Sequence, residues 1–435
     1  MRVLKGIPLR RRVLRRLYHW SQWRCLEPVV IFESDDWGLA RRPCSEFLRA
    51  YGEPGGWAEE QLETPEDLSA LYDVLNSHLD SVGRTACFTA NFIVGNPDFE
   101  AISRDGFTKY YDMPIGQDAN LRKSWLEGME RRAFYPQYHG RSHFWPEAWL
   151  RDLRNDVPGA REMFNERYHG GIALLKGQGW RYHAEYTDWK TGAQRDEDEL
   201  RDWLKVGTDY FQHLFGFFPR STIASHFVLT PEIARGWHDI GGQFFQGTGY
   251  RIVRLSDGRM HVVTHALGER SPEGLLLTRR TAKFEPRFEK SNYDVDGALR
   301  EAELCFRSNI PVIIDTHRIN YTGRWRDDSL RSLDSFLRGL QKYKPRFLTS
   351  VEMGEAIDQN GHYRDVWTGE ARCLTSLETP WRKMLRARWG QYVTSSMIKN
   401  DGKVNPASTA FKIAMIWFFA LPHWGLLASY SPGNL

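Results

Sequence analysis

Short apolar runs alternate with segments of helical periodicity through most of this 435-residue chain. The runs are rich in β-branched and aromatic residues, and this alternation is typical of βα units and a parallel sheet. About seven or eight such units predict an α/β fold, a closed or nearly closed (β/α) barrel with its site at the carboxyl ends of the strands. The predicted strands span 29–34, 86–94, 133–138, 221–225, 243–246, 275–278, 312–315 and 347–350. The predicted helices include 65–79, 147–155, 196–215, 231–239, 295–308 and 328–343.

Two stretches, 96–125 and 161–190, follow neither the strand period nor the helix period. Both are rich in aromatic, glycine and charged residues, and we expect them to be insertions over the rim of the barrel. The glycines of the second stretch are not followed by Gly-Lys-Ser/Thr, which excludes a phosphate-binding loop of that type. A β-hairpin is predicted at 251–264, with Ser256-Asp257-Gly258 at its turn.

Both ends of the chain are basic and aromatic. The basic N-terminal segment, 1–27, has apolar residues at helical spacing and predicts a short amphipathic helix on an anionic membrane surface, or else a solvated or folded-back arm. The C-terminal extension, 361–435, contains an apolar run at 413–421 that is too short to span a bilayer, which takes about 20 residues. It is predicted to be an interfacial, partner-binding or packed helix. Between these segments, 28–360 is the predicted barrel.

Composition narrows the class of protein. A hydrophobic share of 41% with 26% charged residues is that of a soluble globular chain. An aromatic share of 14%, with 17 Trp, indicates carbohydrate or lipid contacts, or a Trp-rich core. Five widely spaced cysteines argue against a disulfide framework and a Cys-based zinc cluster. Without a signal-peptide pattern, we expect a cytoplasmic protein, peripheral on the inner face of the membrane if its ends bind lipid. No nucleic-acid partner is expected, because no binding module accompanies the basic residues.

The first predicted strand ends in two adjacent acids, Asp35 and Asp36. Neighbouring residues of a strand project to opposite faces of its pleat, so two like charges would leave the sheet together at one rim. That arrangement is costly unless a cation shares it. The pair therefore predicts a metal site, with a helix N-cap as the alternative.

A second cluster, His139-Gly140-Arg141-Ser142-His143, follows the strand at 133–138. Both imidazoles can face one point, and one carboxylate would complete a set of three ligands for a divalent cation. The glutamate that follows the first histidine in metalloproteases is missing here, which disfavours peptide hydrolysis. A purely structural histidine pair is the alternative.

A third strand, at 312–315, runs into His317 and Arg318. Its imidazole would reach the same rim as the acids and the histidine pair, although a hydrogen-bonded strand-end histidine is the simpler interpretation of that residue alone. Three such strand ends together supply what a metal hydrolase needs, namely metal ligands, a base and an acid.

In the order and spacing of these motifs the chain resembles the polysaccharide deacetylases, the NodB-homology group of carbohydrate esterase family four, over 28–350. The resemblance implies a distorted (β/α)7 barrel that hydrolyses an amide carbon–nitrogen bond other than a peptide bond. It implies Asp35 as general base and His317 as general acid. It also implies a divalent ion, Zn²⁺ first and Co²⁺, Ni²⁺ or Mn²⁺ as alternatives, on Asp36, His139 and His143.

The chain departs from the family pattern in two places. Its segment at 218–226 lacks the family's Arg-Pro-Pro-Tyr-like turn, and Arg280 and Glu285 stand only near the place of the family's supporting Asp and Arg. Trp37 could stack on a sugar or plug the barrel, and His226 could line the pocket or cap a helix. The predicted substrate-binding residues are Trp37, His226, Arg280, Glu285 and Arg318.

The implied substrate is an N-acylated, most simply N-acetylated, amino sugar of a polysaccharide. The basic ends extend this to a lipid-linked glycan. A glycoside hydrolase on a related barrel is a second hypothesis, and it needs a separated acid such as Glu285 or Asp315. A glycan-binding or membrane-assembly protein that keeps the metal without the reaction is the third.

Overall fold

The computed structural model describes residues 20–41, 59–168, 174–175, 179–180, 184–188, 191–254, 260–288 and 293–387. The predicted N-terminal amphipathic helix, the turn of the predicted hairpin at 256–258 and the apolar run at 413–421 lie outside these residues. Among the residues that are described, no helix combines the length and the apolar character needed to cross a bilayer.

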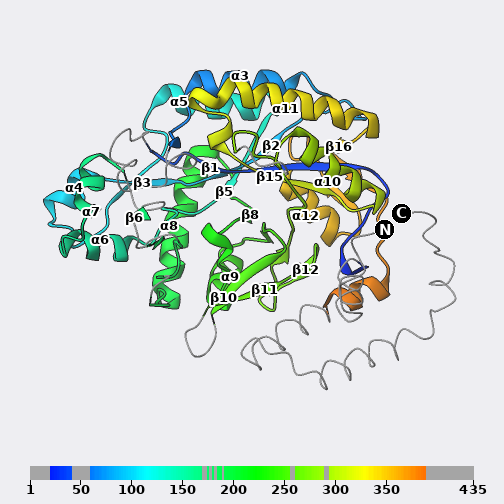
Figure 1. Cartoon of the computed structure of the whole chain (residues 1–435). Coiled ribbons are helices and arrows are strands. Elements are labelled where there is room, and N and C mark those ends of the chain that lie inside the picture. The colour runs from blue at the N-terminus through cyan, green and yellow to red at the C-terminus, as the bar shows by residue number, and fades with distance from the viewer. Residues whose placement is uncertain are drawn as a thin grey trace, which may run out of the picture.

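Parallel strands form a ring with helices on its outside (Figure 1). A strand or helix of the predicted type overlaps each predicted range, but the strands predicted at 221–225 and 347–350 are shorter, and Ser350 already begins a helix. Around the ring, neighbouring strands pair in the order β1 (Val29–Trp37), β2 (Phe88–Phe92), β5 (Phe134–Tyr138), β8 (Ser221–Thr222), β9 (Phe244–Phe245) and β13 (Leu276–Leu277), and β1 also pairs with β15 (Val312–His317). Short strands extend the sheet: β16 (Arg346–Phe347) pairs with the start of β1, and β12 (Glu269–Arg270) runs antiparallel to β13.

One run of chain, 275–284, closes the ring. Its first half, β13, pairs with β9, and its second half, β14 (Ala282–Lys283), pairs with β15. Between the two halves, the Arg280 amide donates to Gly247 O and the Thr281 amide donates to Ile313 O. Because this run bonds to both ends of the sheet, seven strand positions enclose an interior, and the predicted (β/α)7 barrel is confirmed.

The two faces of β1 bury different cores. Val30 and Phe32 face outward into the cluster shared with the barrel helices. Val29 and Ile31 face inward, into a second apolar cluster. Residues of α12 (Ser350–Asp358) form part of this cluster. The outer layer comprises α3 (Pro65–Asn76), α5 (Ala119–Glu130), α8 (Glu197–Phe215), α9 (Pro231–Asp239), α10 (Val295–Arg307) and α11 (Arg326–Leu340). Within these clusters, Trp23, Trp37, Trp125 and Trp237 are fully buried, so part of the tryptophan excess serves the core.

The stretch at 96–125 is only partly the insertion that we expected. Strands β3 (Gly95–Pro97) and β4 (Asp112–Pro114), with α4 (Phe99–Arg104), do lie outside the ring. However, α5 begins inside this stretch and is a helix of the barrel. Its helical period was missed because its buried face consists of only Leu121, Trp125 and Gly128.

A side layer packs next to the carboxyl end of β5. It contains α6 (Pro146–Arg154) and α7 (Ala160–Asn165), which share a small apolar core, and the strand pair β6 (Leu174–Leu175) and β7 (Gly179–Trp180). Figure 1 shows these elements together with α4 on one side of the barrel. The hairpin predicted at 251–264 is present as β10 (Tyr250–Arg254) and β11 (Met260–Thr264).

The described parts of both predicted end segments pack on the barrel. Trp23 and Cys25 belong to the inner core, and Cys25 forms a bridge with Ser376. On the C-terminal side, β17 (His362–Arg364) and β18 (Ala371–Cys373) form a small antiparallel pair. The domain boundaries at 27 and 360 remain predictions.

Candidate metal centre

Asp36, His139 and His143 converge on one point at the carboxyl ends of β1 and β5. Asp36 Oδ1 lies 3.3 Å from His139 Nε2 and 3.4 Å from His143 Nε2. This set has the chemistry and spacing of a metal-binding group. Asp36 Oδ1 is buried and has no hydrogen-bond partner, which a cation at this point would provide. The residues therefore fit a divalent ion bound by two nitrogens and one oxygen.

An irregular end to β1 brings the acid pair together, where regular alternation would separate the two side chains. The register between β1 and β2 shifts between Ser34 and Trp37, and Asp36 has a φ of 74°. The left-handed region is uncommon for a residue other than glycine and often marks a functional site. The expectation of one acid on each face is therefore wrong.

Backbone contacts orient His139. Its Nδ1 lies 2.8 Å from Ile223 O in the segment after β8, so Nδ1 carries the proton. The lone pair of Nε2 is then available to a metal ion. Burial would lower the pKa of His139, but the adjacent carboxylates of Asp36 and Asp35 raise it. His143 lies at the end of the irregular segment 139–143, the histidine turn, with its ring centroid 4.7 Å from that of His139.

Asp35 is held by Arg280 and Asn91. Arg280 donates to both carboxylate oxygens, at 2.6 and 2.8 Å, and Asn91 Nδ2 donates to Oδ1 at 2.7 Å. Burial opposes ionisation of this carboxyl, but the charge and hydrogen bonds of Arg280, together with the nearby His139 and His317, outweigh it, and the pKa of Asp35 falls to about 2. Asp35 is therefore ionised at neutral pH.

Arg280 sits among three carboxylates inside the barrel. Besides Asp35, it donates to Glu33 Oε2 at 2.8 Å and to Asp315 Oδ1 at 2.5 Å. Its side chain is only 2% exposed, and the predicted contact of Arg280 with substrate stays a prediction. The guanidinium neutralises buried acids, as the family's supporting arginine was expected to do.

His317 and Glu285 form a second pair at the rim. His317 Nδ1 lies 2.5 Å from Glu285 Oε1, and its Nε2 lies 3.8 Å from Asp35 Oδ2. Burial would lower the pKa of His317, but the Glu285 carboxylate raises it to about 10. Asn320 Nδ2 donates to the other oxygen of Glu285. Glu285 therefore orients His317 and favours its protonated form, and its predicted contact with substrate stays a prediction.

Two other residues predicted to contact substrate, Trp37 and Arg318, are also buried. Trp37 is 1% exposed, donates its ring N–H to Ser34 Oγ at 3.0 Å and packs edge-on against Phe134. Arg318 is fully buried, where its NH1 donates to Leu39 O at 2.8 Å and to Glu63 Oε2 at 2.9 Å. Both side chains are buried among residues next to the rim, and their contact with substrate stays a prediction.

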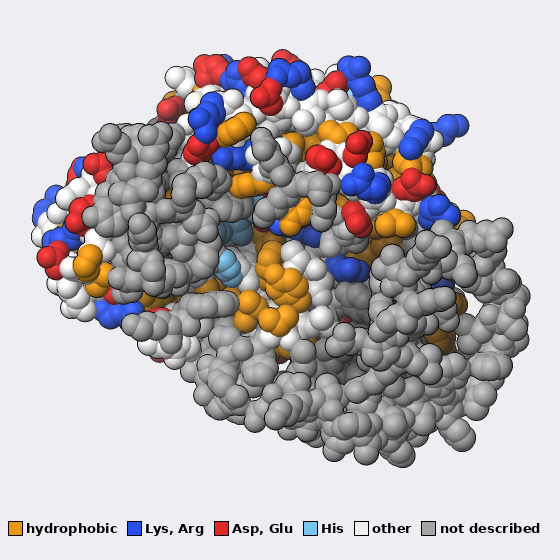
Figure 2. Space-filling model, in the orientation of Figure 1, with side chains coloured by type: hydrophobic (Ala, Val, Ile, Leu, Met, Phe, Trp, Pro, Cys, Tyr) orange, Lys and Arg blue, Asp and Glu red, His pale blue; other side chains and the backbone are white. Residues whose placement is uncertain are grey.

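His226 stays a candidate for the pocket wall. It is half-buried and its φ is 55°. It lies close enough to Asp36 and His139 for their charges to affect its pKa. Burial lowers its pKa to about 3, so its imidazole is neutral at physiological pH. In Figure 2, histidine side chains lie recessed in the middle of the visible face, beside an apolar patch.

Sequence reasoning missed a polar layer beneath the site. Asn91 also donates to Gln246 Oε1 at 2.7 Å, and Gln246 in turn donates to Ser221 Oγ at 2.9 Å. The sequence feature that could have indicated this layer is Asn91, a polar residue in the middle of a buried strand. Because such groups are costly to bury unpaired, Asn91 indicated a partner inside the barrel.

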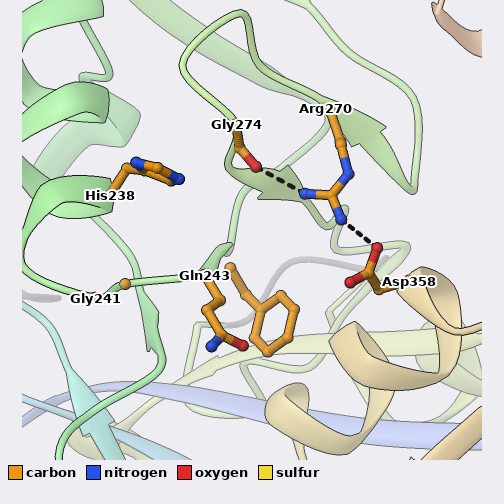
Figure 3. A pocket seen from close by; sticks show the side chains of 8 residues that line it. His238, Gly241, Gln243, Arg270, Gly274 and Asp358 are labelled. Atoms are coloured by element: carbon orange, nitrogen blue, oxygen red, sulfur yellow. Dashed lines mark hydrogen bonds and ion pairs between the residues drawn. The ribbon is translucent and has the colours of Figure 1, made fainter.

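A separate hollow of about 260 Å³ lies at the amino end of β9 (Figure 3). Gln243, Arg270 and Asp358 are among its lining residues, and none of the predicted site residues reaches it. Arg270 pairs there with Asp358 and with the Gly274 carbonyl. The candidate metal-binding set of Asp36, His139 and His143 lies instead at the carboxyl ends of the strands.

No protein-family model matches the chain, and no curated protein matches it. Solved structures do resemble it. Several are polysaccharide deacetylases. They include a probable polysaccharide deacetylase from Pseudomonas aeruginosa, at 10% identity and a TM-score of 0.39, covering 76% of this chain and 91% of that chain. A family 4 acetyl xylan esterase from Clostridium thermocellum in complex with a cobalt ion matches at 9% identity and a TM-score of 0.33, covering 75% and 89%.

An exo-type maltose-forming amylase from Pyrococcus sp. ST04 is also similar, at 10% identity and a TM-score of 0.40, covering 80% of this chain and 52% of that chain. The deacetylases among these structures belong to the family that the sequence motifs resemble. The barrel itself follows from the strand pairing described above.

Proposed function

We propose that this protein is a metal-dependent hydrolase that removes an N-acyl group, most simply acetyl, from an amino sugar of a polysaccharide. One observation carries the proposal. The carboxyl ends of β1, β5 and β15 bring a three-donor metal set, an ionised carboxylate and a protonated imidazole to the same rim.

Asp36, His139 and His143 would hold the ion. When bound there, a divalent cation would polarise the acyl oxygen and lower the pKa of a water molecule. The donor set suits Zn²⁺, and Co²⁺, Ni²⁺ and Mn²⁺ also accept nitrogen and oxygen ligands. Metal analysis of the purified protein would identify the ion.

Asp35 and His317 divide the proton transfers. Their surroundings push the two pKa values apart, to about 2 and about 10, so that at neutral pH one group is an anion and the other a cation. Such divergence is a mark of acid and base assignments. Asp35 accepts the proton of the attacking water, and His317 donates one to the departing amine.

A glycoside hydrolase would need a second free carboxyl group across from Asp35. The acids suggested for that role are both engaged: Glu285 pairs with His317, and Asp315 pairs with Arg280. The same Arg280 weakens the hypothesis of a protein without activity, because the support for Asp35 is present. Release of acetate, with no release of reducing sugar, would decide between the two hydrolases.

Asp35→Asn tests the assignment of the base. We expect acetate release from N-acetylated glycans to fall by about 10² to 10⁴, since a positioned proton acceptor contributes on that order. Metal content should be retained, because Asp36 and the histidines are untouched. Asp196→Asn is the matched control, since Asn can replace Asp at the N-cap of α8. Unchanged acetate release in Asp35→Asn would show that the base is another group.

The finer features are proposals as well. We propose a lipid-linked glycan as the substrate, met at the inner, anionic face of the membrane by the basic residues of both ends. Flotation of the full chain with anionic and with neutral vesicles at low salt would test this. Protein that stays at the bottom with both vesicle types would leave a cytoplasmic enzyme acting on a soluble glycan.

A further inference from the structure

The histidine turn carries the metal ligand His143 without any regular secondary structure of its own. Its amides point instead at one buried carboxylate, that of Glu185. The Arg141 and Ser142 amides donate to Glu185 Oε1 at 2.7 and 3.2 Å, and the His143 amide donates to Oε2 at 3.3 Å. Glu185 is fully buried and comes from the stretch 161–190, which we expected to be a peripheral insertion.

The other side of the histidine turn is fixed by the segment after β2. Gly140 O accepts from the Val94 amide at 3.1 Å, and Arg141 O accepts from the Gly95 amide at 2.9 Å. A Cβ atom at Gly140 would lie 1.9 Å from Glu185 Oε2, and Gly140 has a φ of 113°. Only glycine leaves room for the carboxylate to approach the turn this closely.

Glu185 is itself held from several directions. Its Oε1 accepts from Trp203 Nε1 at 2.7 Å, its amide donates to Ser225 Oγ at 2.9 Å, and its carbonyl accepts from Arg195 NH1 at 2.9 Å. Both Arg141 and Arg195 lie over the Trp203 ring, at 4.2 and 4.0 Å from its centroid. The carboxylate is thus a fixed support, tied to α8 and to the segment just before His226.

We propose that Glu185 is a positioning residue of the metal centre, which sets the place of His143 through the amides of the histidine turn. This inference rests on the metal centre proposed above. Asp36 stands on β1, and His139 is oriented by the Ile223 carbonyl, so neither contacts Glu185 through a hydrogen bond of its side chain. His143 is the ligand whose position depends on the insertion.

Titration of the metal-free full-length protein with Zn²⁺ or Co²⁺, followed by calorimetry, tests this directly. In Glu185→Gln, one carboxylate oxygen becomes an NH₂ group that faces an amide donor. We expect metal affinity to fall about 10- to 100-fold, the usual effect of removing a group that orients a ligand. Glu352→Gln is the matched control: Glu352 is also fully buried and accepts backbone amides, from Thr349 and Val366, but lies outside the site. Its metal affinity should stay at the parent value.

A double-mutant cycle with His143→Ala distinguishes positioning from general damage. If Glu185 acts through His143, Glu185→Gln should cause no further loss of affinity in the His143→Ala background. Equal losses in both backgrounds, or parent-like affinity in Glu185→Gln, would overturn the inference and leave the proposed function standing. A parent protein that binds neither ion would overturn both. If Glu185→Gln does not fold, Trp203→Phe removes the indole N–H that Glu185 accepts and keeps an aromatic ring beneath Arg141 and Arg195. It should show the same loss in smaller measure, and the same cycle with His143→Ala.

Discussion

Charge pairs decide what individual residues of the site can do. Arg280 holds Asp35 as an anion, and Glu285 holds His317 as a cation. Burial by itself would favour the neutral form of Asp35 and of His317, and the charged partners keep both groups ionised. The sequence identified Asp35 and His317 from their strand ends. It placed Arg280 and Glu285 only near the family's supporting residues and did not show which group each one pairs with, because neither stands next to its partner in the chain.

Glu285→Gln should move the alkaline limb of the pH–rate profile. His317 must be protonated to act as an acid, so the rate falls as pH rises through its pKa of about 10. Removing the Glu285 charge lowers that pKa by roughly 1 to 3 units. The profile should therefore lose activity near neutral to mildly alkaline pH, measured as kcat/KM across the range where the variant stays folded.

Glu27→Gln is the control for this prediction, because Glu27 bonds Thr375 away from the site. Its alkaline limb should coincide with that of the parent protein. If Glu285→Gln also keeps the parent limb, the group titrating there is not His317.

At the scale of elements, the carboxyl end of β1 and the histidine turn depart from regular geometry. The strand period predicted Asp35 and Asp36 on opposite faces at one rim, and the positive φ of Asp36 and the register shift beside it break that period. Likewise, α5 packs so closely that its buried face includes Gly128. Periodicity in sequence finds regular elements well and misses the places where a site or a close contact breaks the period.

Gly128→Ala measures how tightly α5 packs. Alanine gains about 1 kcal/mol of helix propensity over glycine. Its Cβ, however, would lie 2.4 Å from the buried Tyr72 ring and 2.9 Å from Phe134 Cβ, and overpacking costs about 1 to 3 kcal/mol. We expect net destabilisation of about 1 kcal/mol in urea unfolding. Gly339→Ala, which meets only the flexible end of Leu299, should be milder; the reverse order would show that α5 has room.

At the scale of the whole molecule, closure of the barrel places the arginine that supports Asp35. Residues 275–284 bond to both sheet ends and carry Arg280 into the interior at the same time. The candidate metal ligands Asp36, His139 and His143 come from separate parts of the chain and meet only in the folded barrel. An ion bound to them should therefore stabilise the folded state.

Metal addition should therefore raise the free energy of unfolding. At a free ion concentration about 100 times Kd, the gain is about 2.7 kcal/mol, because only the folded state presents the donors together. Thermal or urea unfolding with and without Zn²⁺, and with a chelator added afterwards, would show it. His139→Ala should remove most of the gain. An equal gain in His139→Ala would place the ion elsewhere.

The sequence by itself determined the order of strands and helices and the residues at the strand ends, because both depend on local periodicity and on the rule that parallel strands share a carboxyl rim. Asp35, Asp36, His139, His143 and His317 followed from that rule. Only the tertiary structure decided which charges meet. Arg280 stands 245 positions from Asp35, and Glu185 stands more than 40 from the amides it binds. Such pairings depend on how the ring closes, and no pattern of neighbouring residues records it.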